Sequence, residues 1–175
     1  MHTSNPTRRV YARVAGFTLL FYIAAGITSL SLDSQLQIVD LLYFLQNLSA
    51  LVLGVTFYML THEHGPALAL LALTSRIMEA IHSESEIFFA VGSLLFCWLL
   101  VRGRLIPRPL AWLGVVASVI LVIVLPLQLA GVLVGTGWSD SNTWLIWLPM
   151  LVFEVTLSLR LLIWGVTASE TNTSR

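Results

Sequence analysis

Residues 110–134 read LAWLGVVASVILVIVLPLQLAGVLV, a run of 25 residues without a charged side chain. A helix that crosses the hydrocarbon of a bilayer needs about 20 such residues. Hydrocarbon offers the backbone no hydrogen-bonding partner, so a run of this length must be helical. The stretch therefore predicts a membrane-spanning helix that tilts or kinks around Pro126.

Five further segments have the same apolar character, and they cover approximately residues 14–32, 38–60, 66–82, 87–101 and 143–166. The first follows a basic start, but it is longer than the core of a signal peptide, so we expect it to be retained. The segment 87–101 is only about 22 Å long as a straight helix, and we expect it to extend back through Glu84–Glu86. The sequence thus predicts an all-α fold: a six-helix transmembrane bundle forming one integral membrane domain, residues 1–175.

The composition supports this class and excludes several others. The chain is 57% hydrophobic and 10% charged, against about 25% charged in an ordinary soluble domain. Its formal net charge is zero, which argues against a nucleic-acid partner. Cys97 is the only cysteine, so neither a disulfide nor a Cys-based metal site is expected. The absence of a phosphate-binding loop or a serine-nucleophile motif leads us to expect no cofactor.

The cations indicate an orientation. If six helices cross the membrane, one side holds seven of the nine basic residues and the opposite loops hold none: Arg8, Arg9, Arg13, Arg102, Arg104, Arg108 and Arg175. Short basic loops stay in the cytoplasm, so we predict cytoplasmic termini and location in a bacterial inner membrane, with lipids as partners. Trp112 and Trp164 would mark the inner interface, and Trp138 and Trp144 the outer one.

The predicted outer side is acidic, with His82 near the acidic residues Asp33, Asp40, Glu84, Glu86 and Asp140. The positive-inside rule alone accounts for this excess of acidic residues. Because the spacing of His82, Glu84 and Glu86 matches no zinc motif, no metal site is expected there.

Five charged residues fall within predicted spans: Asp40, Arg76, Glu79, Glu154 and Arg160. Arg76, Glu79 and Glu154 lie deepest in their spans, and they are the main candidates for a functional site. Arg76, Glu79 and Glu154, left unpaired, would together cost on the order of 10 kcal/mol, so they should face the interior and pair. Arg76 and Glu79 are three residues apart and can meet on one helix. Either Arg76 also bridges to Glu154, or Glu154 stays protonated because a dry site disfavours its charge.

A second group of polar residues lies in the segment 38–60. Asp40, Tyr43 and Asn47 follow a spacing of three and four residues, so they share one helix face. One interpretation makes them the wall of a ligand-binding pocket that continues the cluster of Arg76, Glu79 and Glu154. The other is that they form hydrogen bonds between helices, which polar side chains commonly do in membranes.

Four short stretches resemble one family. They are Ala12-Arg13-Val14-Ala15-Gly16 followed by Tyr22, Arg76-Ile77-Met78-Glu79-Ala80, Leu105-Ile106-Pro107-Arg108 followed by Leu110 and Leu113-Gly114, and Pro149 with Glu154, Leu161-Leu162 and Gly165. Together they are similar to the DUF4386 family of bacterial membrane proteins. The chain departs from that pattern in shorter outer loops, in Arg160 at an apolar position and in Trp164 at a basic one. The family carries no established activity, so the resemblance implies a fold only.

Three functional hypotheses follow from the sequence. The first is an intramembrane pocket that binds or acts on a small lipophilic molecule, with Glu154 and Glu79 as candidate catalytic residues and Arg76, Asp40, Tyr43 and Asn47 as candidate ligand-binding residues. The second is a small proton-coupled transporter that uses Glu154, expected to be a homo-oligomer because six helices make a narrow path. The third is a structural or regulatory membrane subunit, without catalysis, whose charges only hold helices together. The sequence does not distinguish an enzyme from the other classes.

Overall fold

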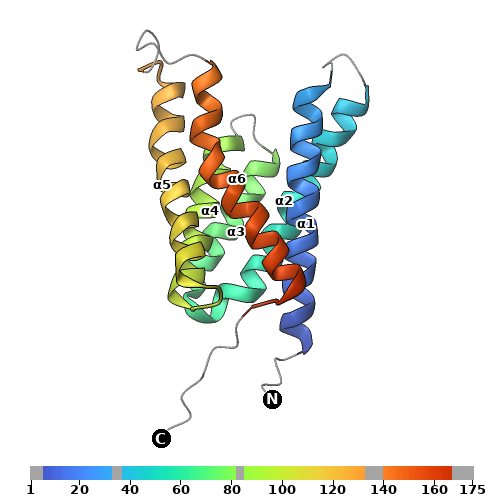
Figure 1. The fold of residues 1–175 in the computed structure, drawn as a ribbon, viewed down its shortest axis with the longest axis vertical. Helices are drawn as coiled ribbons and strands as arrows, with labels where there is room; N and C mark the ends of the chain where they lie inside the picture. The colour runs from blue at the N-terminus through green and yellow to red at the C-terminus, as the bar shows by residue number, and fades with distance from the viewer. Residues whose placement is uncertain (1–5, 33–36, 82–84, 133–139, 167–175) are drawn as a thin grey trace, which may run out of the picture.

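The computed structural model describes residues 6–32, 37–81, 85–132 and 140–166. These residues form six α-helices and a short 3₁₀ turn (Figure 1): α1 Pro6–Ser31, α2 Gln37–Thr61, η1 His62–His64, α3 Pro66–Ile81, α4 Ser85–Arg102, α5 Arg108–Leu129 and α6 Asp140–Ile163. Each apolar segment of the sequence coincides with one helix. The predictions for Asp33, His82, Glu84, Trp138 and Arg175, and for the side chain of Asp140, lie outside what the structure describes.

The end of α5 differs from the sequence prediction, which placed the end of the span at residue 134. The helix ends at Leu129 because Gly131 has a φ of 70°, a left-handed conformation that glycine adopts without strain. The amide of Val132 donates to the carbonyl of Leu127 and that of Gly131 donates to Gln128, a Schellman motif. Apolar composition continues past this point, but the backbone has already turned.

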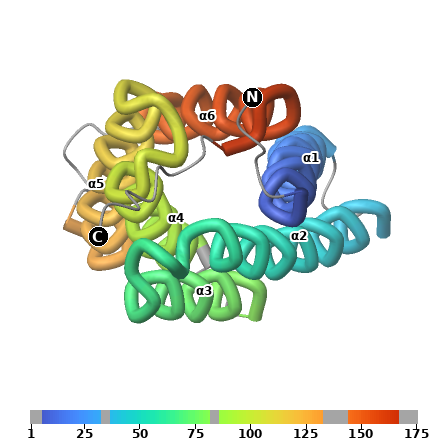
Figure 2. Tube along the Cα trace, turned by 90° about the horizontal axis from the view of Figure 1, so that it is seen from below, coloured from blue at the N-terminus to red at the C-terminus, as the bar shows by residue number. Residues whose placement is uncertain are grey.

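The helices form a closed ring. Each helix contacts the next one along the chain, and α6 returns to contact α1, as the view along the bundle shows (Figure 2). Gly16 makes the closure possible: a Cβ atom there would lie 2.7 Å from the backbone oxygen of Ser158. The absence of a side chain at Gly16 therefore lets α1 and α6 approach closely.

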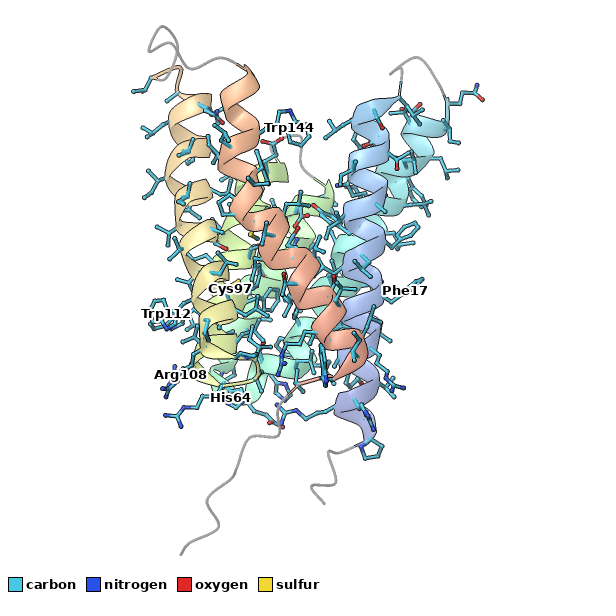
Figure 3. The ribbon with its side chains drawn as sticks, viewed as in Figure 1. Phe17, His64, Cys97, Arg108, Trp112 and Trp144 are labelled. Carbon is cyan, nitrogen blue, oxygen red and sulfur yellow. The ribbon has the colours of Figure 1, made fainter. Side chains whose placement is uncertain are left out.

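The two ends of the bundle differ. Helix α1 begins and α6 ends at the same end (Figure 1), which we call the terminal end; the opposite end is the distal end. Arg108 and Trp112 lie at the terminal end and Trp144 at the distal end (Figure 3). The hairpin of α3 and α4, with 16 and 18 residues, stops short of the distal ends of the other helices, which have 22 to 26 residues (Figure 1).

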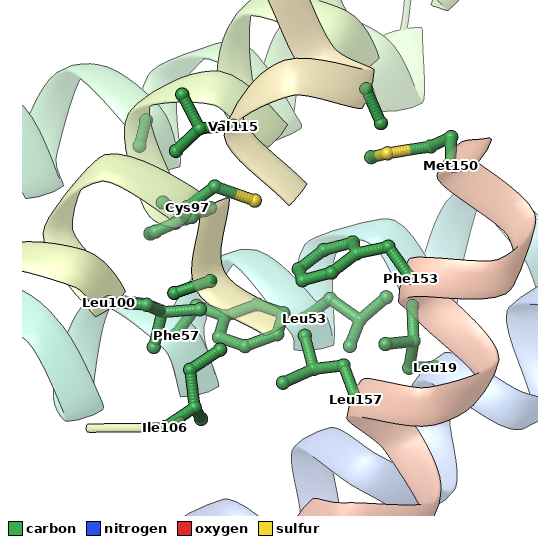
Figure 4. Close-up of a cluster of buried hydrophobic side chains, with 14 of the residues drawn as sticks. Leu19, Leu53, Phe57, Cys97, Leu100, Ile106, Val115, Met150, Phe153 and Leu157 are labelled. Atoms are coloured by element: carbon green, nitrogen blue, oxygen red, sulfur yellow. The ribbon is translucent and has the colours of Figure 1, made fainter. Parts of the chain in front are cut away.

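Apolar side chains occupy both the interior and the outer surface. The interior contains Leu53 and Phe57 from α2 and Phe153 and Leu157 from α6, packed around Cys97 (Figure 4). Large apolar side chains also cover the outside, among them Phe17, Leu41, Leu71, Val116 and Leu148. Such a surface suits hydrocarbon rather than water. By length and composition, four described helical segments can cross a membrane: Pro6–Ser31, Gln37–His64, Arg108–Leu129 and Trp144–Ile163.

Candidate functional site

An ion pair lies inside the bundle at the distal part of α3. Arg76 Nη1 donates to Glu79 Oε2 at 2.7 Å, and the two residues are only 3% and 4% exposed. Their separation of three residues on one helix brings the side chains together without a tertiary contact. The pair predicted from the sequence is therefore confirmed, and it neutralises two charges that would each be costly alone.

Both charged groups also bind neighbouring helices. Tyr22 on α1 donates its hydroxyl hydrogen to Glu79 Oε1 at 2.8 Å, so each carboxylate oxygen of Glu79 accepts a hydrogen bond. Arg76 Nη2 donates to Ser93 Oγ on α4 at 3.2 Å. The pair thus joins α1, α3 and α4 through charge-assisted hydrogen bonds, which are about twice as strong as neutral ones.

A row of aromatic side chains contacts this cluster. Phe89 on α4 stacks against Tyr22 with ring centroids 6.2 Å apart, and it contacts Trp147 of α6 at 5.8 Å. The Arg76 guanidinium carbon lies 4.8 Å from the centre of the Phe89 ring, a cation–π contact. Each of the three aromatic residues lies about one turn distal to a residue that lines the cavity described next, so the row lies on the distal side of that cavity.

Glu154 on α6 faces Arg76 across a small cavity. The cavity has a volume of about 20 Å³, room for a single water-sized group. Its polar lining comes from Arg76, Ser93, Cys97 and Glu154, and its apolar lining is formed by Leu19, Phe57, Phe96, Leu100, Met150, Phe153 and Leu157. Glu154 is 7% exposed, and within the described part of the chain it forms no direct hydrogen bond.

The predicted bridge from Glu79 through Arg76 to Glu154 is only half formed. The ion pairs among described residues are Arg76–Glu79 and Arg8–Glu63, so the guanidinium does not reach Glu154. The Nη1 and Nη2 atoms of Arg76 donate to Glu79 and Ser93 instead. The Arg76 Nε atom is buried and has no partner among the described residues. The site thus holds one unused donor, on Arg76, and one unused carboxyl group, on Glu154, and both residues line the same cavity.

The polar residues of α2 do not join this cluster, and the prediction that they lie in the interior is wrong. Asp40, Tyr43 and Asn47 are all exposed, with 47% of Tyr43 accessible. The cause is the length of α3, which packs on this face of α2 at Gly54 but ends at Ile81. Farther towards the distal end α3 no longer covers the face.

Sequence reasoning did not assign Tyr22, Phe89, Ser93 or Cys97 to the site. Tyr22 was noted only within the family resemblance, and Ser93 and Phe89 lie in an apolar segment without a charged neighbour to mark them. The feature that marks Tyr22 and Ser93 is a hydroxyl within hydrogen-bonding distance of a buried charge. That proximity depends on how the helices pack, so the sequence does not show it. Within residues 6–32, 37–81, 85–132 and 140–166, no three His, Cys, Asp or Glu side chains are grouped to hold a metal ion.

The fold and the site together define a helical integral membrane protein with a buried ionic cluster beside a small cavity. Residues 83–165 match the model of the DUF4386 family, described as a domain of unknown function, which confirms the family resemblance over that part of the chain, just under half of its length. No curated protein and no solved structure matches the chain. The matched range contains Ser93 and Glu154, whereas Tyr22, Arg76 and Glu79 precede it.

The hydroxyl of Tyr22 provides a direct test of the cluster. We expect Tyr22→Phe to lower the free energy of unfolding by about 1–3 kcal/mol, because Glu79 Oε1 would lose its donor in a buried position. Unfolding of the purified protein in mild detergent, followed by circular dichroism during a denaturant titration, measures the change. Tyr43→Phe is the matched control, since Tyr43 is exposed and no described residue depends on its hydroxyl; equal losses from both variants would contradict the assignment.

Proposed function

We propose that the protein binds the polar head of a small lipophilic molecule in the cavity between Arg76 and Glu154. The observation that carries the proposal is that two residues with unused polar groups line one cavity: Arg76, whose Nε donor has no described partner, and Glu154, whose carboxyl forms no direct hydrogen bond with a described residue. Arg76 would hold a carbonyl or anionic group, and Glu154 would donate or accept a proton. A mostly apolar wall with a few convergent polar groups is typical of small-molecule sites.

The size of the cavity limits what enters it. A volume of about 20 Å³ accommodates one oxygen-bearing group such as a carbonyl or hydroxyl, at the scale of one water. The apolar part of the ligand would pack against Leu19, Phe153 and Leu157 and displace them slightly. A molecule already dissolved in the bilayer supplies such an apolar part, so the proposed ligand is a lipid-like carbonyl compound or carboxylic acid.

Glu154→Gln tests this proposal, because glutamine keeps the size of the side chain but cannot exchange a proton. The probe is a medium-chain carboxylic acid with a photoreactive diazirine, added to the purified protein in detergent and mapped by mass spectrometry. We expect labelling near Leu157 to fall about tenfold, the loss of one hydrogen bond to a charged group. The melting temperature should stay unchanged, and the exposed Thr156→Val variant on the same helix should label normally.

Unchanged labelling in Glu154→Gln, accompanied by a lower melting temperature, would contradict the pocket. If Arg76→Leu then restored part of that loss, the charges would have a structural role only, as in a non-catalytic membrane subunit.

A second candidate function is proton-coupled transport, and one observation favours it. Tyr22, Glu79 and Arg76 form a hydrogen-bonded chain that ends at the cavity opposite Glu154. One water in the cavity could connect the chain to Glu154, and such chains of ionisable groups serve as proton relays in membranes. A proton flux across proteoliposomes that depends on Glu154 would favour transport, carried out by an oligomer, over ligand binding alone.

For the topology, we propose that all six helices lie within a bacterial inner membrane, with α3 and α4 as a shorter hairpin, and that both termini are cytoplasmic. The support is the distribution of basic residues: those at the start of α1, the end of α4 and the start of α5 belong to the terminal end of the bundle. Among the described residues, α2 and α3 carry no basic residue at their distal ends, and this asymmetry is typical of the positive-inside rule.

A further inference from the structure

The exposed polar residues of α2 form a stripe that we call the distal stripe, composed of Asp40, Tyr43 and Asn47. Asp40, Asn47 and Gly54 are each seven residues apart, so they lie on one face of the helix. Gly54 belongs to the part of this face that α3 covers: a Cβ atom there would lie 3.0 Å from both Arg76 Cβ and Leu73 Cδ1. The distal stripe therefore continues the α3-facing surface beyond the point where α3 ends.

The lengths of the helices place the stripe beyond the end of α3. Arg76, which lies level with Gly54, is five residues from the end of α3 at Ile81, or about 7.5 Å. Asn47 is seven residues from Gly54 in the same direction, about 10.5 Å. The whole of α3, with 16 residues, measures about 24 Å, less than the roughly 30 Å of a hydrocarbon core. The distal ends of α3 and α4, at Ile81 and Ser85, thus fall short of the distal surface of a bilayer that the longer helices cross.

This arrangement would be costly if lipid filled the space above the hairpin. Asn47 lies near the middle of α2, and a polar side chain facing hydrocarbon at that depth loses its hydrogen bonds to water. By contrast, Phe44 and Leu48, each about 100° around α2 from Tyr43 and Asn47, are exposed and apolar. The helix therefore presents an apolar side and a polar side next to each other at the same depth.

We propose that water enters the bundle from the distal end and fills the space above the α3–α4 hairpin, where it solvates the distal stripe. Helix pairs α1–α2 and α5–α6 extend past the distal ends of α3 and α4 (Figure 1). In this proposal the aromatic row, in which Phe89 contacts both Tyr22 and Trp147, is the floor of this space. This inference does not depend on what binds in the cavity.

Single cysteines test the proposal, starting from a Cys97→Ala background because Cys97 is the only native cysteine. Asn47→Cys and Leu48→Cys are neighbours at nearly the same depth, and Leu48 is 48% exposed. Each variant is reconstituted in lipid nanodiscs and treated with a charged, membrane-impermeant methanethiosulfonate. Since only the thiolate reacts and hydrocarbon suppresses it, we expect Asn47→Cys to react at least about tenfold faster than Leu48→Cys. Tyr43→Cys and Phe44→Cys form a second pair with the same expected order.

Each other outcome contradicts the proposal. Equal protection of Asn47→Cys and Leu48→Cys would mean that lipid or protein covers the stripe, and equally fast reaction would mean that this part of α2 lies outside the bilayer. Spontaneous disulfide dimers of Asn47→Cys would assign the stripe to an interface with a second copy of the chain. The melting temperature of each variant in detergent identifies any that has failed to fold, and the second pair then decides the result.

Discussion

Replacing Arg76 with leucine is expected to lower the free energy of unfolding by about 3–5 kcal/mol, the usual cost of removing one partner from a buried ion pair. The variant would leave the Glu79 carboxylate buried with Tyr22 as its only donor among the described residues, and it would remove the cation–π contact with Phe89. Denaturant titration in mild detergent, with helicity as the signal, measures the loss. Arg13→Leu, at an exposed arginine near the start of α1, should change the value by less than about 0.5 kcal/mol.

The double variant Arg76→Leu/Glu79→Leu separates the pair from its individual charges. With both charges removed, no uncompensated ion remains in the interior, so we expect most of the stability to return. Glu79→Leu alone should be destabilising as well, because the guanidinium would retain only Ser93 as a described partner. If the effects of the two single variants simply add in the double variant, the ion pair contributes no coupling and our account of the cluster is wrong.

The second large effect is expected at Gly16, where α1 and α6 close the ring. A valine there would put its Cβ atom 2.7 Å from the Ser158 backbone oxygen and 3.0 Å from the Leu162 backbone nitrogen, and a backbone cannot rotate away as a side chain can. Overpacking of this kind costs about 1–3 kcal/mol, and more where helices must separate. Separation would also move Tyr22 of α1 away from Glu79, so the Gly16→Val variant should lose stability together with ligand labelling near Leu157.

Gly26→Val provides the matched control on the same helix. A Cβ atom at Gly26 would meet the Gln46 Nε2 atom at 3.0 Å, the far end of a flexible side chain. Gln46 can adopt another rotamer, so the loss at Gly26 should be much smaller than at Gly16. Thermal unfolding in detergent compares the two variants, and equal losses at the two positions would refute the close α1–α6 contact.

The buried charges show which contacts of the site could be predicted from the sequence. The spacing of Arg76 and Glu79 on one predicted helix was sufficient to pair them, because that contact is local. The same energetic argument predicts a partner for Glu154. Its position across the cavity from Arg76, however, depends on how α6 crosses the bundle. The hydrogen bonds from Tyr22 and to Ser93 depend on helix rotation, which an apolar segment with little amphipathic pattern does not reveal.

Asp40, Tyr43 and Asn47 show where reasoning from periodicity fails. The spacing correctly put the three residues on one face of a helix, and the assumption that polar residues in a membrane face the interior then placed that face in the pocket. A neighbouring helix covers a face only along its own length, and α3 ends before it reaches these residues. The rule that polar groups avoid lipid still holds under our proposal, with water rather than protein as the partner.

The sequence alone determined that the chain folds into six helices and that Arg76 and Glu79 pair. Both results follow from hydrocarbon, which forces the backbone into helices and makes an isolated charge costly. The tertiary structure alone decided that Glu154 faces Arg76 without touching it, that aromatic rings contact the cluster, and that the polar side of α2 lies beyond the end of α3. Those features depend on the crossing angles, rotation and relative height of packed helices. An apolar composition determines none of these three properties.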